Sequence, residues 1–198
     1  MQVLVLASAS KYRAELLNRL NLPFQQVSPD VDESQLAGES AKELAHRLAF
    51  IKAQAPAIAE FIVNSPISPI IIASDQVAAF GDRILGKPGT LERARQQLGS
   101  MQGQSISFHT SLYMRNLADG THFSALDTTV ARLRSLNSSE IGRYLAADNP
   151  LDCAGSFKVE SLGISLFSSV EALDPTALVG LPMIAVCEGL RQFGLEVP

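Results

Sequence analysis

The sequence predicts a soluble α/β protein, and three observations predict it. Short apolar segments such as "QVLVLA" and "PIIIA" alternate with segments whose apolar residues recur every three to four positions. Hydrophobic residues make up 46% of the 198-residue chain and charged residues 18%, which is enough to fill a substantial core. No apolar run reaches the length of a membrane span, and the N-terminus lacks the pattern of a signal peptide. We therefore expect a cytoplasmic protein without membrane association.

The first part of the chain predicts three strands and two helices. We expect strands at 2–7, 23–27 and 69–74 and helices at 10–20 and 40–62, with the order of the strands left open. Ser40 followed by Glu43 forms a capping box that marks the start of the second helix, and Pro56 predicts a kink within it. Its buried face is predicted by apolar residues at helical spacing, namely Leu44, Leu48, Ile51, Ala55, Ile58 and Ile62.

The remainder of the chain predicts two hairpins and several helices. The hairpin turns are Gly81-Asp82 and Asp119-Gly120, the second between β-rich stretches at 104–116 and 121–134. Helix starts are expected at Thr90, at Asn137 with Glu140, at Asp174-Pro175 and at Pro182, and Gly194 is a helix stop. Because no repeat or obvious linker divides the chain, we expect a single domain over residues 1–198.

Composition excludes several function classes. The net charge is −4 and no block of Lys and Arg occurs, so nucleic-acid binding is not expected. Cys153 and Cys187 form neither a disulfide framework nor a metal cluster, and we expect both to be buried as small apolar residues. The three histidines are widely spaced, which argues against a zinc site, and the chain lacks the common glycine-rich phosphate loops.

The stretch "LASASKYRAELLNRL" places cations where a helix normally begins with acidic residues. The unpaired N–H groups and the dipole make a helix N-terminus electropositive, so Lys11 and Arg13 work against it. One interpretation is a bound phosphate, held by Ser8, Ser10, free amides and Arg13. The alternative is that Ser10 caps the helix and Arg13 lies in solvent.

Further polar residues follow predicted strands or lie in loops. "PIIIASDQV" predicts a buried strand that ends at Asp75 and Gln76, where α/β sheets usually place ligands. "LGKPG" presents Lys87 in a loop, and Lys52 lies beside the apolar stripe of its helix. "PDVDES" brings Asp30, Asp32 and Glu33 together, and carboxylates close to phosphate are typical of Mg²⁺ or Mn²⁺ ligands. Each of these side chains has an ordinary alternative as a solvated surface group, but together they favour metal-assisted phosphoryl chemistry over acyl transfer.

Taken as a set, these motifs resemble the Maf nucleotide pyrophosphatases from Val3 to about Gly194. The resemblance rests on "LASASKYRAELL", "DVDES", Lys52, "ASDQVAAFGDRILGKP", "DCAGSFKVESLG" and "LVGLP" in this order. It implies a Maf/inosine-triphosphatase-like α/β fold, an elongated mixed sheet flanked by helices with a central cleft. It also implies hydrolysis of a nucleoside triphosphate between the α and β phosphates with a divalent cation, Mg²⁺, Mn²⁺ or Co²⁺, and it places Asp75 at the position of the catalytic base.

Three departures from the commoner family pattern are similar to the subgroup that acts on 7-methyl-GTP. They are Ser10-Lys11-Tyr12-Arg13, Asp75-Gln76, and "SFKVESLG", in which Glu160 stands where a Gln is usual. Methylation at N7 leaves guanine cationic, and the Tyr12 ring would attract it by about 0.5 to 2 kcal/mol. The Glu160 carboxylate would accept from guanine N1–H and the exocyclic amine, with Gln76 as a polar neighbour, whereas it would repel the carbonyls of thymine and uracil.

The expected roles are therefore catalytic for Asp75, Lys52 and Lys87, and substrate-binding for Ser8, Ser10, Tyr12, Arg13, Gln76 and Glu160. Asp75 and Glu33 are the expected metal contacts, with Asp32 behind them, and base and ligand roles both stay open for Asp75. Two alternatives remain: a pyrophosphatase that prefers dTTP or UTP, and a nucleotide-binding regulator of cell division without turnover. A homodimer is compatible with the sequence, although nothing in it argues for one.

Overall fold

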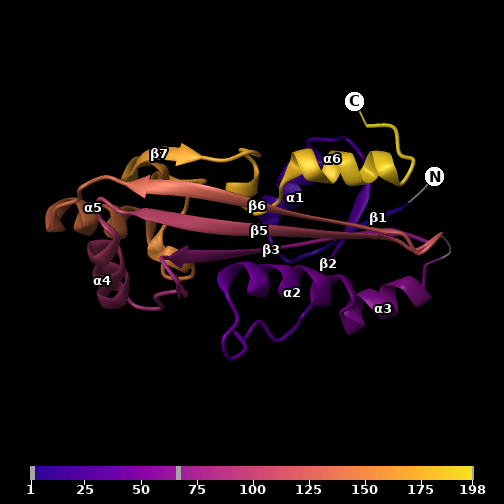
Figure 1. Cartoon of the computed structure of the whole chain (residues 1–198), viewed down its shortest axis with the longest axis horizontal. Coiled ribbons are helices and arrows are strands. Elements are labelled where there is room, and N and C mark those ends of the chain that lie inside the picture. The colour runs from indigo at the N-terminus through magenta and orange to yellow at the C-terminus, as the bar shows by residue number, and fades with distance from the viewer. Residues whose placement is uncertain (1–2, 66–67, 198) are drawn as a thin grey trace.

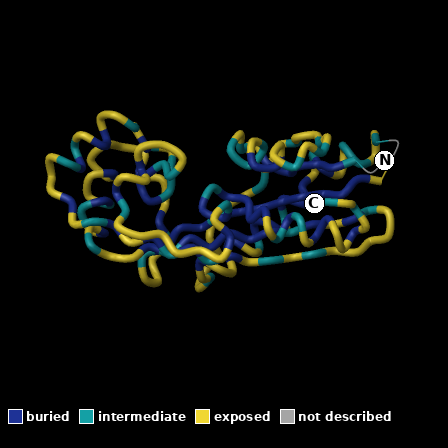
Figure 2. Tube along the Cα trace, turned by 90° about the horizontal axis from the view of Figure 1, so that it is seen from above, coloured by how far each residue is buried: buried dark blue, intermediate teal, exposed yellow. Residues whose placement is uncertain are grey.

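Three long strands determine the length of the molecule (Figure 1). In the computed structural model, which describes residues 3–65 and 68–197, these are β3 (Ile70–Phe80), β5 (Ser105–Asn116) and β6 (His122–Leu133). They pair antiparallel over nearly their whole length, and β5 and β6 are joined by the predicted Asp119-Gly120 turn, with Gly120 at a φ of 77°. The inner stretches of β3 and β5 are largely buried, whereas β6 alternates between buried and more exposed residues (Figure 2).

The sheet is mixed, with the order β2-β1-β3-β5-β6-β7. At one side β2 (Phe24–Val27), β1 (Leu4–Ala7) and β3 run parallel, and at the other β7 (Phe167–Glu171) pairs antiparallel with β6. The short β4 (Arg83–Ile84) folds back on β3 through the predicted Gly81-Asp82 turn. The prediction of an elongated α/β fold with a mixed sheet is confirmed.

Helices cover both faces because residues along β3 alternate between them. Ile70 and Ile72 pack with α1 (Lys11–Asn18) and α6 (Met183–Gln192), whereas Ile71 and Ala73 face α3 (Pro56–Val63) and the end of α2 (Ala41–Ala53). A third cluster lies under α4 (Leu91–Met101) and α5 (Ser138–Asp148). The chain also forms short 3₁₀ helices, η1 (Ala154–Ser156), η2 (Leu162–Leu166) and η3 (Ala177–Val179). Among the residues that the structure describes, no helix combines the length and apolarity needed to cross a bilayer.

One edge of β3 has a gap in its strand pairing. β1 pairs with β3 only as far as Ile72, and β4 begins to pair with the same edge at Ala79. The opposite edge is paired with β5 throughout this stretch. The segment around Ser74 therefore has no strand partner on this edge, whereas Ala78 O already accepts from the Leu85 N–H at 2.8 Å. Buried backbone groups in such a gap need other partners.

The structure corrects two predicted elements and adds one strand. The strand predicted at 69–74 continues to Phe80, so Asp75 and Gln76 lie in mid-strand rather than at its end, because pairing with β5 carries the strand past them. The helix predicted over 40–62 is two helices, since Pro56 lacks an N–H and the residue before it, Ala55, takes an extended conformation. β7 was not predicted because its residues are mostly exposed. Of the first predicted strand, Gln2 lies outside the described residues.

The last helix begins at Pro182, as predicted, but no α-helix starts at Asp174-Pro175. Asp174 instead forms a turn, in which its Oδ1 accepts from the N–H of Thr176, 2.9 Å away. Its Oδ2 accepts from the N–H of Ile184 at 2.7 Å, in the first turn of α6. The buried Asp174 therefore ties the segment that contains η3 to the start of α6.

Candidate active site

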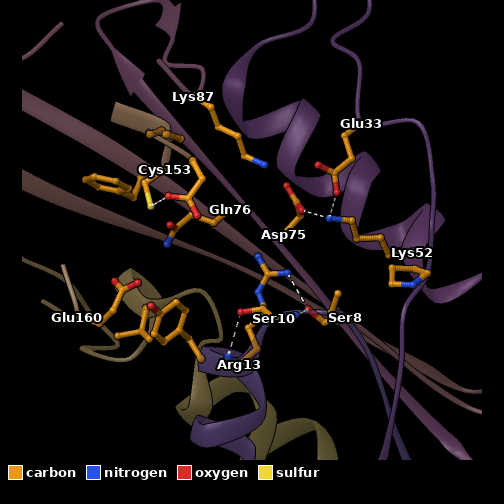
Figure 3. A pocket seen from close by; sticks show the side chains of 18 of the residues that line it. Ser8, Ser10, Arg13, Glu33, Lys52, Asp75, Gln76, Lys87, Cys153 and Glu160 are labelled. Carbon is orange, nitrogen blue, oxygen red and sulfur yellow. Dashed lines mark hydrogen bonds and ion pairs between the residues drawn. The ribbon is translucent and has the colours of Figure 1, made fainter. Parts of the chain in front are cut away.

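A cavity of about 980 Å³ lies beside the open stretch of β3. Its wall is built from the β1–α1 turn, the loop after β2, α2, β3, the loop after β4 and residues 152–160 (Figure 3). The structure brings together here every candidate residue named from the sequence, which are Ser8, Ser10, Tyr12, Arg13, Glu33, Lys52, Asp75, Gln76, Lys87 and Glu160. Residues that are up to 152 positions apart in the chain therefore share one cavity.

Lys52 holds two carboxylates together at the floor of this cavity. The Lys52 side chain is 8% exposed, and its Nζ lies 2.6 Å from Glu33 Oε1 and also bonds Asp75 Oδ1. Alternation along β3 explains the pairing, because Val77 and Ala79, on the same face as Asp75, pack against α2, the helix that carries Lys52. Asp75 Oδ2 accepts no hydrogen bond from the described part of the chain, and the side chain points into the cavity (Figure 3).

Burial and charge act in opposite directions on the two carboxylates. Burial raises the pKa of Asp75, and the Glu33 charge adds to this, although Lys52 and Arg13 oppose it. Glu33 is also penalised by burial, but its hydrogen bond to Lys52 and the charges of Lys52, Lys87 and Arg13 prevail and lower its pKa. Glu33 therefore stays ionised more readily, and Asp75 holds a proton more easily.

Arg13 bridges the gap in the strand pairing of β3. Its Nη1 donates to Ser74 O at 2.7 Å and to Ser8 Oγ at 3.3 Å, and its Nε donates to Gly180 O at 2.8 Å. Ser10 does cap α1, by accepting from the Arg13 backbone N–H at 3.4 Å, but the alternative that Arg13 lies in solvent is wrong. Burial lowers the pKa of Arg13, while the nearby Asp75 and Glu33 charges raise it. The guanidinium is thus a fixed positive charge beside Asp75.

The β1–α1 turn is held by Gln26, a residue that the sequence analysis did not single out. Gln26 Nε2 donates to Ser8 O at 2.7 Å and to Ser10 O at 3.2 Å. Ser8 is buried, and its Oγ accepts from the Ser10 N–H at 3.1 Å. Gln26 lies on β2, which pairs with β1, so only the strand order reveals that it can reach this turn.

Gln76 anchors the segment around η3. Its Nε2 donates to Thr110 Oγ1, Ala177 O and Leu178 O at 2.9 to 3.0 Å. Thr110 and Ser74 also donate to this segment, to Ala177 O and Gly180 O respectively. The Gln76 amide nitrogen is therefore engaged by protein, and the "LVGLP" motif is explained by the carbonyls that it presents to β3 and to Arg13.

Apolar side chains complete the other wall, and sequence reasoning missed them. Phe108 and Phe157 pack edge to face with ring centroids 5.5 Å apart, and both line the cavity together with Val159 and Leu178. Phe108 was within a predicted strand, but its contact with residues 152–160 depends on pairing that the sequence did not specify. The wall can receive a flat, partly apolar group such as a base.

Tyr12 and Glu160 line the same cavity without strong protein contacts. Tyr12 is half-buried, and Lys11 Nζ lies 4.9 Å from its ring centroid, which shows that the ring already receives a cation. Glu160 is exposed, and within residues 3–65 and 68–197 its side chain makes no hydrogen bond or ion pair. Both side chains are therefore available to a ligand.

Carboxylates outnumber cations in the wall. The cations are Arg13, Lys52 and Lys87, and the carboxylates are Asp30, Asp32, Glu33, Asp75, Asp152 and Glu160. In the described part of the chain, no group of three or more His, Cys, Asp or Glu residues is arranged to hold a metal ion by itself. Any divalent cation here would need oxygen atoms from a ligand as well as from protein.

The two cysteines do not behave as predicted. Cys153 and Cys187 are free thiols, and each is half-buried rather than buried. Cys153 lines the cavity next to Asp152, and burial, with the Asp152 charge, raises the pKa of its thiol to about 11. It is therefore a weak nucleophile at neutral pH.

Comparison with known proteins gives one consistent result. The family model described as "Maf-like protein" matches residues 3–193. Proteins named 7-methyl-GTP pyrophosphatase are 48% identical in Pseudomonas aeruginosa and 52% identical in Xanthomonas axonopodis pv. citri, each over 198 residues and 100% of both chains. One from Bordetella pertussis is 46% identical over 98% of this chain and 93% of its own. Among solved structures, the Staphylococcus aureus Ham1 protein matches with a TM-score of 0.45 and 13% identity over 97% of each chain, which adds nothing to the family assignment.

Gly180→Ala should disturb Arg13 specifically. Gly180 has a φ of 111°, and an added Cβ would lie 3.2 Å from Arg13 Nε. Gly194→Ala is the matched control, because Gly194 has a φ of 81° but no atom within 4 Å of an added Cβ. We expect both variants to lose about 1 to 2 kcal/mol of unfolding free energy from backbone strain. Only Gly180→Ala should also shift the Arg13 Nε–H signal in ¹H–¹⁵N spectra, and an unchanged signal would contradict the bridging role.

Glu33→Gln should lower the pKa of Asp75 in the metal-free protein. The Glu33 charge raises that pKa, and its removal also leaves Lys52 to Asp75 alone. The titration is to be followed through the Asp75 carboxyl carbon by NMR, with its midpoint expected at lower pH than in the wild type. Asp30→Asn, which removes a cavity carboxylate that is not among the charges acting on Asp75, should leave the midpoint in place. A midpoint that rises in Glu33→Gln would refute the coupling.

Proposed function

The chain belongs to the Maf family, and on that premise we propose that it hydrolyses 7-methyl-GTP to 7-methyl-GMP and pyrophosphate. The observation that carries the proposal is the cluster of Lys52, Asp75 and Glu33 on the floor of a cavity of about 980 Å³, with Arg13 and Lys87 beside it. A cavity of this size accommodates a nucleotide, and the cluster combines proton-accepting groups with phosphate-binding cations.

The reaction is the attack of water on the α-phosphorus. A new P–O bond forms, the bond from the α-phosphorus to the bridging oxygen breaks, and pyrophosphate leaves with the bonding electrons. Asp75 Oδ2, which accepts no hydrogen bond from residues 3–65 and 68–197, receives the proton of the water. Burial raises the pKa of Asp75, which makes it a better proton acceptor than an ordinary Asp at the pH of the cell.

The cations hold the triphosphate and offset the charge that develops on the leaving group. Lys87 is exposed and extends toward Asp75, so it is placed to meet phosphate oxygens (Figure 3). Lys52 is already desolvated between two carboxylates, and Arg13 is fixed by two backbone carbonyls. Because these groups are fixed before substrate binds, little reorganisation opposes the reaction. Ser8 and Ser10 complete the phosphate contacts from the β1–α1 turn.

The donor set fits a divalent cation that is shared with the substrate. Mg²⁺ is commonly bound by one or two carboxylates plus substrate phosphates, and Glu33 and Asp75 supply two neighbouring carboxylates, each with one oxygen held by the Lys52 ammonium. The wall also carries more carboxylates than cations, so a triphosphate would be repelled without added positive charge. When bound, Mg²⁺, Mn²⁺ or Co²⁺ would supply charge neutralisation and acidify water. Asp32 lies in the same loop as a further carboxylate.

The choice of nucleotide base depends on Tyr12 and Glu160, two cavity side chains with few contacts to protein. The Tyr12 ring already attracts the Lys11 ammonium, and a cationic 7-methylguanine would compete for the same face. Glu160 is a free carboxylate that accepts from guanine N1–H and the exocyclic amine, whereas uracil and thymine offer it carbonyls. Phe108 and Phe157 provide the apolar wall, and the Gln76 oxygen is the polar group left to the base.

We place the reaction in the cytoplasm, as the removal of a modified nucleotide. The alternatives are turnover of dTTP or UTP by the same chemistry, and binding of nucleotide without turnover. The free Glu160 carboxylate disfavours the first, and the uncommitted Asp75 Oδ2 disfavours the second.

The first test is pyrophosphate release from 7-methyl-GTP, GTP, dTTP, UTP and CTP with Mg²⁺, Mn²⁺ or Co²⁺. We expect fastest turnover of 7-methyl-GTP and loss of turnover in EDTA. Asp75→Asn should lower turnover by about 10²-fold or more because the proton acceptor is lost. Asp82→Asn, in the exposed turn before β4, makes the same chemical change and should be silent. Near-normal turnover in Asp75→Asn, or nucleotide binding without any release of pyrophosphate, would refute the proposal.

Glu160→Gln should reduce selectivity rather than chemistry. An amide cannot offer two acceptors, so the ratio of kcat/KM for 7-methyl-GTP over UTP should fall by about 10-fold or more. Glu171→Gln, an exposed carboxylate on β7 outside the cavity wall, is the control. Equal ratios in Glu160→Gln and wild type would remove Glu160 from base recognition.

A further inference from the structure

A second cavity, of about 440 Å³, adjoins the candidate active site. One wall is residues 83–88, the β4 strand and the loop after it, and the other is a single face of α4. Arg93, Gln96, Gln97 and Ser100 line it from α4, at positions three, four and seven apart, which is one helical face. The function proposed above uses none of these four side chains.

The charge of this cavity is entirely of one sign. Arg83, Lys87 and Arg93 line it, and no Asp or Glu does. In the described part of the chain, none of the three makes an ion pair or donates a side-chain hydrogen bond. Three cations without an acidic partner stand out in a protein of net charge −4, and because all three side chains are exposed, an anion can reach them from solvent.

The polar groups between the cations are held by the protein. Gln97 Nε2 donates to Gly86 O at 3.3 Å, and Gln97 Oε1 accepts from Ser156 Oγ. Gln96 Nε2 donates to Glu92 Oε1 at 2.9 Å, which engages the acidic neighbour of Arg93 on α4. The guanidinium of Arg83 lies 5.7 Å from the ring centroid of Phe80. The glutamine side chains of the cavity wall are therefore held in place by hydrogen bonds, while the charged groups of Arg83, Lys87 and Arg93 make no hydrogen bond to the described residues.

Lys87 connects this cavity with the active site. It lines both cavities, and its ammonium extends toward Asp75 (Figure 3). An anion bound by Lys87 in the second cavity would share that cavity with Arg83 and Arg93. A cavity of about 440 Å³ with three cations suits a short, highly charged anion, and guanidinium groups bind phosphate oxygens through paired N–H donors.

We propose that this second cavity binds a diphosphate anion, and that its ligand is the pyrophosphate released next to it. The source of the ligand rests on the proposed function, whereas the anion site rests on the geometry alone. The product would then leave in two stages, from Lys87 to the pair of Arg83 and Arg93. Free pyrophosphate would also occupy the cavity at rest, and this would slow release of the next product.

The test is calorimetric titration of inorganic pyrophosphate into the metal-free protein. The wild type is compared with the double variant Arg83→Gln/Arg93→Gln and with Arg95→Gln, which removes a cation from the same helix but outside the cavity wall. We expect a binding component that the double variant weakens by about tenfold or more and that Arg95→Gln retains. Thermal unfolding of the three proteins checks that all are folded.

Identical pyrophosphate binding in all three folded proteins would overturn the proposal. GDP is titrated in parallel to distinguish free pyrophosphate from the diphosphate of a nucleotide. Tighter binding of GDP than of pyrophosphate, lost in the double variant, would overturn the assignment of the ligand. If the wild type releases no pyrophosphate from any nucleotide, the proposed function fails, and the titration still decides whether the anion site exists.

Discussion

The hydrogen bond from Arg13 to Ser74 O is the interaction on which the site depends. β3 has no strand partner between Ile72 and Ala79 on one edge, and a buried carbonyl without a donor costs about 1 to 3 kcal/mol. A side chain fills this gap where a strand otherwise would. Arg13 reaches this carbonyl with a side chain from α1, so the edge of β3 gains a hydrogen-bond partner but no neighbouring strand. The space that such a strand would fill is left as the cavity.

The strand segment that Arg13 holds also positions polar residues of the cavity. Asp75 and Gln76 are adjacent on β3 and point to opposite faces, one toward Lys52 on α2 and the other toward η3. Burying Lys52 and Asp75 together is unfavourable for each ion alone, and their mutual contact offsets only part of that cost. The cluster therefore fixes charge at the cavity rather than adding much to the stability of the fold.

Much of this arrangement could be predicted from sequence, and the rest could not for physical reasons. The capping boxes at Ser40 and Asn137 and the two hairpin turns are local, and the structure has them where they were expected. The length of β3 and the contact of Gln26 with the β1–α1 turn depend on which strands pair, which alternation alone does not specify. The ten candidate residues converge on one cavity, but their catalytic roles stay predictions. Phe108, in a strand, and Phe157, in the loop after η1, were missed because an apolar side chain gives no sign in the sequence of facing a ligand.

The three long strands that run the length of the molecule have a mechanical consequence. β3 and β5 contribute to the cavity wall and continue into both ends of the sheet, so the two sides of the cavity are parts of the same hydrogen-bonded ribbon. The two sides of the cavity can approach each other only if the paired strands bend or twist. Such a change deforms many hydrogen bonds slightly, whereas a hinge in a loop would rotate only a few backbone dihedrals. We therefore expect the width of the cavity to change little, because closing it would strain the paired strands along their length.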